Sequence, residues 1–180
     1  EVVESGDLDA NYFQHTPYLN TFNQENGADL AVAVEMHYEP FGVYPGKTAS
    51  LDELKDGATV AIPNDGSNEA RALLLLQDNG IINSREGAGL EATVNDIVEN
   101  PYNVEIQELE AAQVARVVPE VEFVVLNGNY ALAAGYSVAK DAIAYEKSDS
   151  EAAQTYVNII AVKEGNETNA GVQALIEVLK

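Results

Sequence analysis

One stretch, ATVAIPNDGSNEARALLLLQ at residues 58–77, constrains the fold more than any other. Thr59–Ile62 is a β-branched run typical of a strand, and Pro63 ends it because proline has no amide hydrogen to donate to a sheet. Four turn-forming residues follow, and the last of them, Ser67, can cap a helix that is apolar almost all round as far as Leu76. The stretch therefore predicts a strand, a polar elbow and a buried helix.

Arg71 lies one turn into this predicted helix, in a chain that has only nine Lys and Arg residues. The first amides of a helix point, unpaired, beyond the carboxyl end of the preceding strand, and the helix dipole attracts an anion to that spot. A guanidinium matches a carboxylate bidentately, which a lysine cannot do. Arg71 thus predicts recognition of a carboxylate at the elbow. The alternative is a solvated ion pair with Glu69 or Asp65.

The composition excludes several classes of protein and site. The 180 residues form one large domain or two small ones, and 46% of them are apolar, as in globular proteins. Thirty acidic residues against nine basic ones give a net charge of -21, which repels nucleic acid and anionic lipid. The lack of cysteine excludes disulfides, thiolate nucleophiles and cysteine metal sites. We expect no nucleic-acid partner, no metal ion and no cofactor.

A second strand and elbow follow later in the chain. Val121–Leu126 is an uninterrupted apolar run of the kind found in strands buried on both faces, and Asn127 opens a polar elbow before a short helix. Two such strands, each delivering Asn side chains and helix amides to one edge, predict an open α/β sheet that binds a small ligand. Asn158, inside the apolar strand Tyr156–Lys163, must also find hydrogen-bond partners if it is buried, either backbone or ligand.

Aromatic side chains gather near the start of the chain. Phe13 and His15 flank one glutamine, and Pro17 can begin a helix directly after them. Such a cluster belongs to a core or, if the backbone is extended there, forms one wall of a pocket. Both interpretations stay open from the residues alone.

The remaining pattern predicts a coarse order of elements. Val2–Val3 is typical of a strand remnant, so we expect the chain to begin partway into a domain. Irregular connections predict a middle domain, 44–156, inserted into a second domain built from 1–43 and 157–180. The other expected elements are strands at 30–36 and 104–109, a loop at 42–48, a helix opened by the capping box of Ser50 and Glu53, and helices at 92–98, 111–117, 131–134 and 170–179.

Several segments resemble the NlpA family of lipoproteins, the MetQ type of methionine-binding protein of ABC transporters. The resemblance covers most of the chain, and the order of its motifs is specific. The segments are DLDANYFQHTPYL (7–19), YPGKTASLDELKDGATVAIPNDGSNEARALLLLQDNGI (44–81), VENPYNVEIQELEAAQ (98–113), VLNGNYALAAG (125–135) and YVNIIAV (156–162).

The resemblance implies a bilobed, type II Venus-flytrap fold of the periplasmic-binding-protein kind, which clamps methionine or a close apolar amino acid between its lobes. It implies an ABC permease and ATPase as partners, and a position at the outer face of the cytoplasmic membrane or in the periplasm. The family's lipid anchor sits on an N-terminal cysteine that this chain lacks. The chain also lacks the family's opening strand, its C-terminal segment and the loop between Glu4 and Ser5 whose tyrosine lines the family's pocket.

The family's ligand-binding residues carry over by their motifs. A zwitterionic amino acid would offer its carboxylate to the arginine and the elbow amides, its ammonium to oxygens around the later two asparagines, and its apolar side chain to the aromatic residues. The matching positions are Phe13, His15, Tyr18, Asn68, Arg71, Asn127 and Asn158.

Three alternatives remain for the function. The ligand could be a Gly-Met dipeptide or another amino acid, because an apolar wall distinguishes one methylene by only about 1–3 kcal/mol. The chain could instead be an enzyme on the same scaffold, since fold does not fix function. Candidates for catalysis are few, with two His and no Cys, and His15 is the candidate general base. We expect a receptor without catalytic activity.

Overall fold

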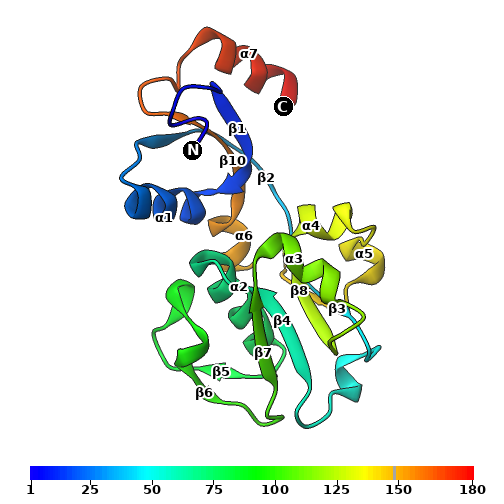
Figure 1. Ribbon diagram of the computed structural model, residues 1–180. Coiled ribbons are helices and arrows are strands. Elements are labelled where there is room, and N and C mark those ends of the chain that lie inside the picture. Colours follow the sequence, from blue (N-terminus) through cyan, green and yellow to red (C-terminus); the bar gives the residue numbers. More distant parts are fainter. Residues whose placement is uncertain (148) are drawn as a thin grey trace. The chain divides into compact units, whose positions relative to one another are not determined.

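The structure is a computed structural model that describes residues 1–147 and 149–180, without the side chains of residues 151 and 152. The chain forms two compact units. We call Pro40–Ser148 the middle unit, and Glu1–Glu39 with Asp149–Lys180 the terminal unit (Figure 1). The domain bounds expected from the sequence stay a prediction.

The middle unit is built on a five-stranded mixed sheet in the order β7-β4-β8-β3-β9 (Figure 1). Strand β4 pairs in parallel with β7 and β8, whereas β3 runs antiparallel to β8 and β9. Since β4 and β8 are parallel neighbours, their carboxyl ends reach the same edge. The strands are β3 (Gly42–Pro45), β4 (Thr59–Pro63), β7 (Glu105–Leu109), β8 (Phe123–Leu126) and β9 (Ala144–Tyr145).

The helices of the middle unit follow the strands closely. The longest, α2 (Gly66–Asp78), begins after β4, and α4 (Gly128–Ala133) begins after β8. The others are α3 (Ala111–Val114), α5 (Val138–Asp141) and the 3-10 turns η1 (Leu51–Glu53), η2 (Gly89–Glu91), η3 (Val94–Asp96) and η4 (Ala115–Val117). A small antiparallel pair, β5 (Asn83–Ser84) and β6 (Ile97–Glu99), lies apart from the main sheet.

Alternate residues of the central strands bury opposite faces of this sheet. Val60 and Ile62 of β4 belong to one apolar cluster together with Leu73 of α2. Ala61, between them, belongs to a second cluster that contains Val124 of β8. Because both faces are covered, β4 and β8 are apolar throughout, as the sequence predicted for β8.

The terminal unit holds a three-stranded antiparallel sheet in the order β1-β10-β2 (Figure 1). Alternate residues of the central strand pack on opposite sides: Ile159 clusters with Leu19, and Ile160 clusters with Ile176. The elements are β1 (Ala10–His15), α1 (Thr16–Asn26), β2 (Leu30–Tyr38), α6 (Glu151–Thr155), β10 (Val157–Lys163) and α7 (Ala170–Leu179).

The predicted α/β class, with open sheets flanked by helices, is confirmed. The strand at 30–36, the strand after Tyr156 and the closing helix at 170–179 are also found. The loop predicted at 42–48 is wrong, since it contains β3, which pairs with two strands distant in sequence. The glycines and proline of this segment suggested a loop, but Gly46 has another reason: a Cβ there would lie 2.3 Å from the Val121 carbonyl oxygen.

Three further expectations are corrected by the structure. Val2–Val3 is part of a turn, and Val3 is buried in the cluster that also holds Leu19. The helix expected at 92–98 is a single 3-10 turn followed by β6, which pairs with β5 instead of continuing a helix. The capping box at Ser50 opens only a 3-10 turn, in which Ser50 Oγ accepts from the Asp52 amide.

Candidate ligand-binding site

The elbow after β4 is organised by Asp65. Its carboxylate caps α2 by accepting from the Asn68 amide at 3.2 Å, and it accepts from Asn68 Nδ2 at 2.9 and 3.1 Å. Ser67, predicted as the cap, lies inside the helix and donates its hydroxyl to Asp65. A negative charge near a helix N-terminus is favourable. The anion at this helix tip is therefore the Asp65 carboxylate, and the Asn68 amide predicted to meet a ligand is already bonded to it.

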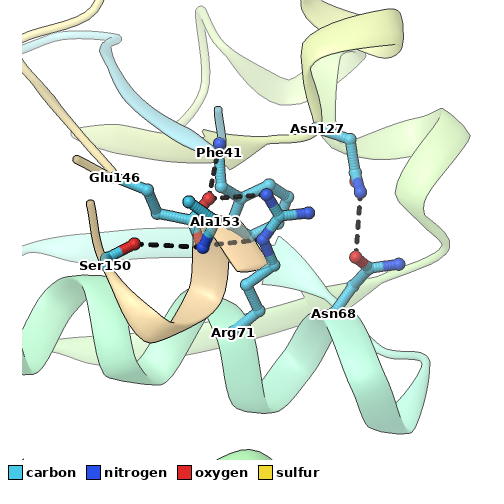
Figure 2. Close-up of polar contacts among 7 residues, drawn as sticks. All are labelled: Phe41, Asn68, Arg71, Asn127, Glu146, Ser150 and Ala153. Atoms are coloured by element: carbon cyan, nitrogen blue, oxygen red, sulfur yellow. Dashed lines mark hydrogen bonds and ion pairs between the residues drawn. The ribbon is translucent and has the colours of Figure 1, made fainter. Parts of the chain in front are cut away.

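Asn127 meets this elbow from the end of the neighbouring strand. Its Nδ2 donates to Asn68 Oδ1 at 2.9 Å, so the side chains of Asp65, Asn68 and Asn127 form a hydrogen-bonded chain (Figure 2). Asn127 Oδ1 is buried and has no hydrogen-bond partner within the described part of the chain. Buried acceptors are almost always satisfied, so this oxygen is suited to an N–H donor from a ligand.

Arg71 lies one turn after Asn68 on α2, and its partner is Glu146. Arg71 Nε lies 2.7 Å from Glu146 Oε1, and Nη2 lies 2.5 Å from Oε2 (Figure 2). Both side chains are about 5% exposed. The guanidinium carbon also lies 4.8 Å from the centroid of the Phe41 ring, a cation–π arrangement. The alternative of a solvated ion pair is wrong, because this pair is buried and bidentate.

Glu69, the other carboxylate of this helix segment, points to a different partner. Its Oε1 accepts from the Val94 amide at 2.9 Å. Burial raises the pKa of Glu69, and the hydrogen bond from Val94 opposes that rise. Glu69 is thus a structural group that holds the 3-10 turn at Val94 to α2.

The aromatic residues of the terminal unit come together as predicted from their spacing. The rings of Phe13 and Tyr18 are 5.9 Å apart, those of His15 and Tyr18 are 6.3 Å apart, and those of His15 and Tyr156 are 4.9 Å apart. His15 caps α1 by accepting from the Tyr18 amide at Nδ1. Because an amide can only donate, neutral His15 carries its proton on Nε2. Phe13, by contrast, is 56% exposed.

Asn158 lies on the central strand of the terminal unit. The strand register pairs it with His15 on β1 and with His37 on β2, so three polar residues form a row across the sheet. His37 also contacts the Tyr12 hydroxyl through Nδ1 and the Glu39 carboxylate, 3.0 Å away, through Nε2. Sequence reasoning missed His37, because only the pairing register brings it beside Asn158.

Other kinds of site are not found where the structure can be described. Residues 1–147 and 149–180 hold no group of three or more His, Cys, Asp or Glu side chains arranged for a metal ion. No helix over the same ranges has the length and apolar character needed to cross a membrane. A hollow of about 250 Å³ beside α3 and α4 contains none of the predicted site residues; it is lined by Ala112, Ala115, Arg116, Tyr130, Ala133 and Ala134.

These features define an α/β chain with open sheets and a polar cluster at the carboxyl ends of two parallel strands. The chain belongs to the NlpA lipoprotein family, whose sequence model matches residues 1–180.

Solved structures and curated relatives agree with this assignment. A crystal structure of a lipoprotein from Ruminococcus gnavus ATCC 29149 is 72% identical, with a TM-score of 0.97, and the match covers 99% of this chain and 73% of that one. A nutrient binding protein from Burkholderia cenocepacia bound to methionine is 46% identical, with a TM-score of 0.93 and coverage of 99% and 73%. The D-methionine-binding lipoprotein MetQ of Salmonella typhimurium (strain LT2) is 42% identical over 179 residues, 98% of this chain and 65% of the relative.

The chain is shorter than these proteins. It spans between 62% and 65% of the length of the curated relatives that it matches.

Proposed function

We propose that this chain is the substrate-binding component of an ABC importer and binds methionine or a close apolar amino acid. We further propose that it acts at the outer face of the cytoplasmic membrane, delivering its ligand to a permease with its ATPase. Family membership and the methionine bound to the Burkholderia cenocepacia relative support this proposal. Within the chain, it depends on the buried, unsatisfied Oδ1 of Asn127.

The amino-acid head group fits the polar cluster of the middle unit. An α-ammonium can donate to Asn127 Oδ1, which the chain from Asp65 through Asn68 holds in a fixed orientation. Glu146 balances the charge of Arg71 and occupies its Nε and one Nη2 hydrogen. A ligand carboxylate at Arg71 would therefore gain hydrogen bonds from the N–H groups that Glu146 does not occupy more than attraction to an unbalanced cation.

The aromatic cluster of the terminal unit is proposed to contact the ligand's side chain. Phe13 is exposed although it is large and apolar, and its ring edge is fixed against Tyr18. Thioethers make favourable contacts with aromatic rings, which suits methionine. His15 would act as a hydrogen-bond donor through Nε2, and Asn158 beside it adds an amide.

The same geometry supports a receptor over an enzyme. A general base needs a lone pair facing the substrate. His15 uses the lone pair of Nδ1 to cap α1, and its Nε2 carries the proton in the neutral form. His15 is therefore placed to donate rather than to abstract a proton.

Ligand identity is tested by recovering what the protein carries. Protein purified without added amino acids is denatured, and the released small molecules are identified by mass spectrometry. We expect unchanged methionine. Calorimetry with L-methionine, D-methionine and Gly-Met then ranks the ligands, and failure of all three to bind would reject the proposal. Recovery of a chemically altered product after incubation with L-methionine would favour the enzyme.

A further inference from the structure

Glu146 joins three segments of the middle unit through one carboxylate. Oε1 accepts from Arg71 Nε at 2.7 Å, and Oε2 accepts from both Arg71 Nη2 at 2.5 Å and the Phe41 amide at 2.8 Å. The backbone amide of Glu146 in turn donates to the Phe41 carbonyl at 3.0 Å. Figure 2 shows this carboxylate facing the guanidinium beside Phe41.

Two of these segments lead to the connections between the units. Phe41 directly follows Pro40, the first residue of the middle unit, and Glu146 lies close to its last residue. The third segment is α2, where Arg71 lies one turn after Asn68 and therefore on the same side of the helix. Glu146 thus ties both chain connections to the helix that carries the proposed head-group site.

This arrangement depends on both the charge and the length of the side chain. A bidentate carboxylate–guanidinium pair requires two acceptor oxygens in one plane. Loss of one partner leaves the other as an uncompensated buried charge. A glutamine at this position would turn one acceptor into a donor that faces the N–H groups of Arg71 or Phe41.

We propose that Glu146 is a positioning residue for ligand binding: it fixes Arg71 on α2 and couples the two chain connections to the head-group site. This inference rests on the proposed function. It assigns to Glu146 an effect on binding that exceeds its effect on stability.

The chain offers a closely matched control in Glu122. Its amide donates to the Thr59 carbonyl at 3.0 Å, and its Oε2 accepts from the Thr59 amide at 2.8 Å. The backbone and carboxylate contacts of Glu122 therefore repeat those of Glu146 to Phe41. No ion pair with an arginine is found for Glu122 among the described residues.

The test compares Glu146→Gln with Glu122→Gln in L-methionine affinity, dissociation rate and thermal unfolding. We expect Glu146→Gln to weaken affinity at least tenfold, mainly through faster dissociation, and Glu122→Gln to change affinity less than twofold. Glu146→Asp keeps the charge but is one methylene shorter, so it should remain folded and still lose at least threefold in affinity.

Two results separate the inference from the function that it assumes. If the wild-type protein binds L-methionine and both Glu146 variants bind within twofold of it, the positioning role is refuted while the proposed function stands. If the wild-type protein itself does not bind, the proposed function fails. If Glu146→Gln does not fold, the affinity of Glu146→Asp decides.

Discussion

Asn68 and Asn127 are 59 residues apart in sequence, and a 2.9 Å hydrogen bond joins their side-chain amides. They meet because each lies at the start of a helix that follows one of two neighbouring parallel strands, β4 and β8. The bond uses the Nδ2 of Asn127 and leaves its buried Oδ1 as an acceptor. The proposed binding of an amino-acid head group depends on that oxygen.

Gly46→Ala should destabilise the protein strongly. Its Cβ would lie 2.3 Å from the Val121 carbonyl oxygen and 2.6 Å from that of Val118, and backbone atoms cannot move aside as a flexible side chain can. Overpacking typically costs about 1–3 kcal/mol, and we expect a loss at the upper end of that range. Urea denaturation measures the free energy of unfolding.

Gly66→Ala is the control for this change. Gly66 is the first residue of α2, and nothing lies within 4 Å of a Cβ built there. Alanine at that position should leave stability unchanged or raise it by up to about 1 kcal/mol. Equal effects of the two substitutions would contradict the close approach of β3 and the β8 side of the sheet at Gly46.

Tyr44→Phe should leave stability unchanged or raise it. The Tyr44 hydroxyl is buried and has no hydrogen-bond partner in the described residues, and burial, with a smaller effect of Asp141, raises its pKa to about 12. Removing an unsatisfied buried hydroxyl relieves a penalty of about 1–3 kcal/mol, part of which the ring's new packing returns. Tyr44→Ala should cost about 3–5 kcal/mol in the same thermal unfolding assay. A loss above about 1 kcal/mol for Tyr44→Phe would reveal a missed partner.

Glu69→Gln should gain stability relative to the wild type as the pH rises. Burial raises the pKa of Glu69 above its ordinary value of 4.5, so the folded state holds the proton to a higher pH than the unfolded state does. The folded state is therefore penalised progressively once the pH passes 4.5 and through the raised value. Glutamine keeps an acceptor for the Val94 amide without the charge. Unfolding measured from about pH 4 to about pH 7 checks this, and a difference independent of pH would contradict it.

The local order of strand, elbow and helix was predictable because it depends on neighbours in sequence. Pro63 does lie at the end of β4, and α2 does begin within the elbow. The choice of cap was not predictable: Ser67 and Asp65 are both good caps, and Asp65 prevails because its carboxylate also accepts from the Asn68 side chain.

Long-range partners were beyond reach of the sequence. Glu146 is 75 residues from Arg71, and nothing in the run Ala144–Tyr145 distinguishes the following glutamate from the 29 other acidic residues. This partner also changes how Arg71 should be tested. Arg71→Ala would leave Glu146 buried and unpaired, which alone costs about 3–5 kcal/mol, so its effect on binding could come from unfolding.

Calorimetry of L-methionine with Asn127→Ala therefore tests the central claim most directly, with Asn129→Ala, an exposed asparagine two residues later, as the control. Loss of a hydrogen bond to a charged group costs about 1.5–3 kcal/mol, so we predict that Asn127→Ala binds roughly 10- to 150-fold more weakly. Asn129→Ala should bind within twofold of the wild type. Binding by Asn127→Ala within threefold of the wild type would contradict the account.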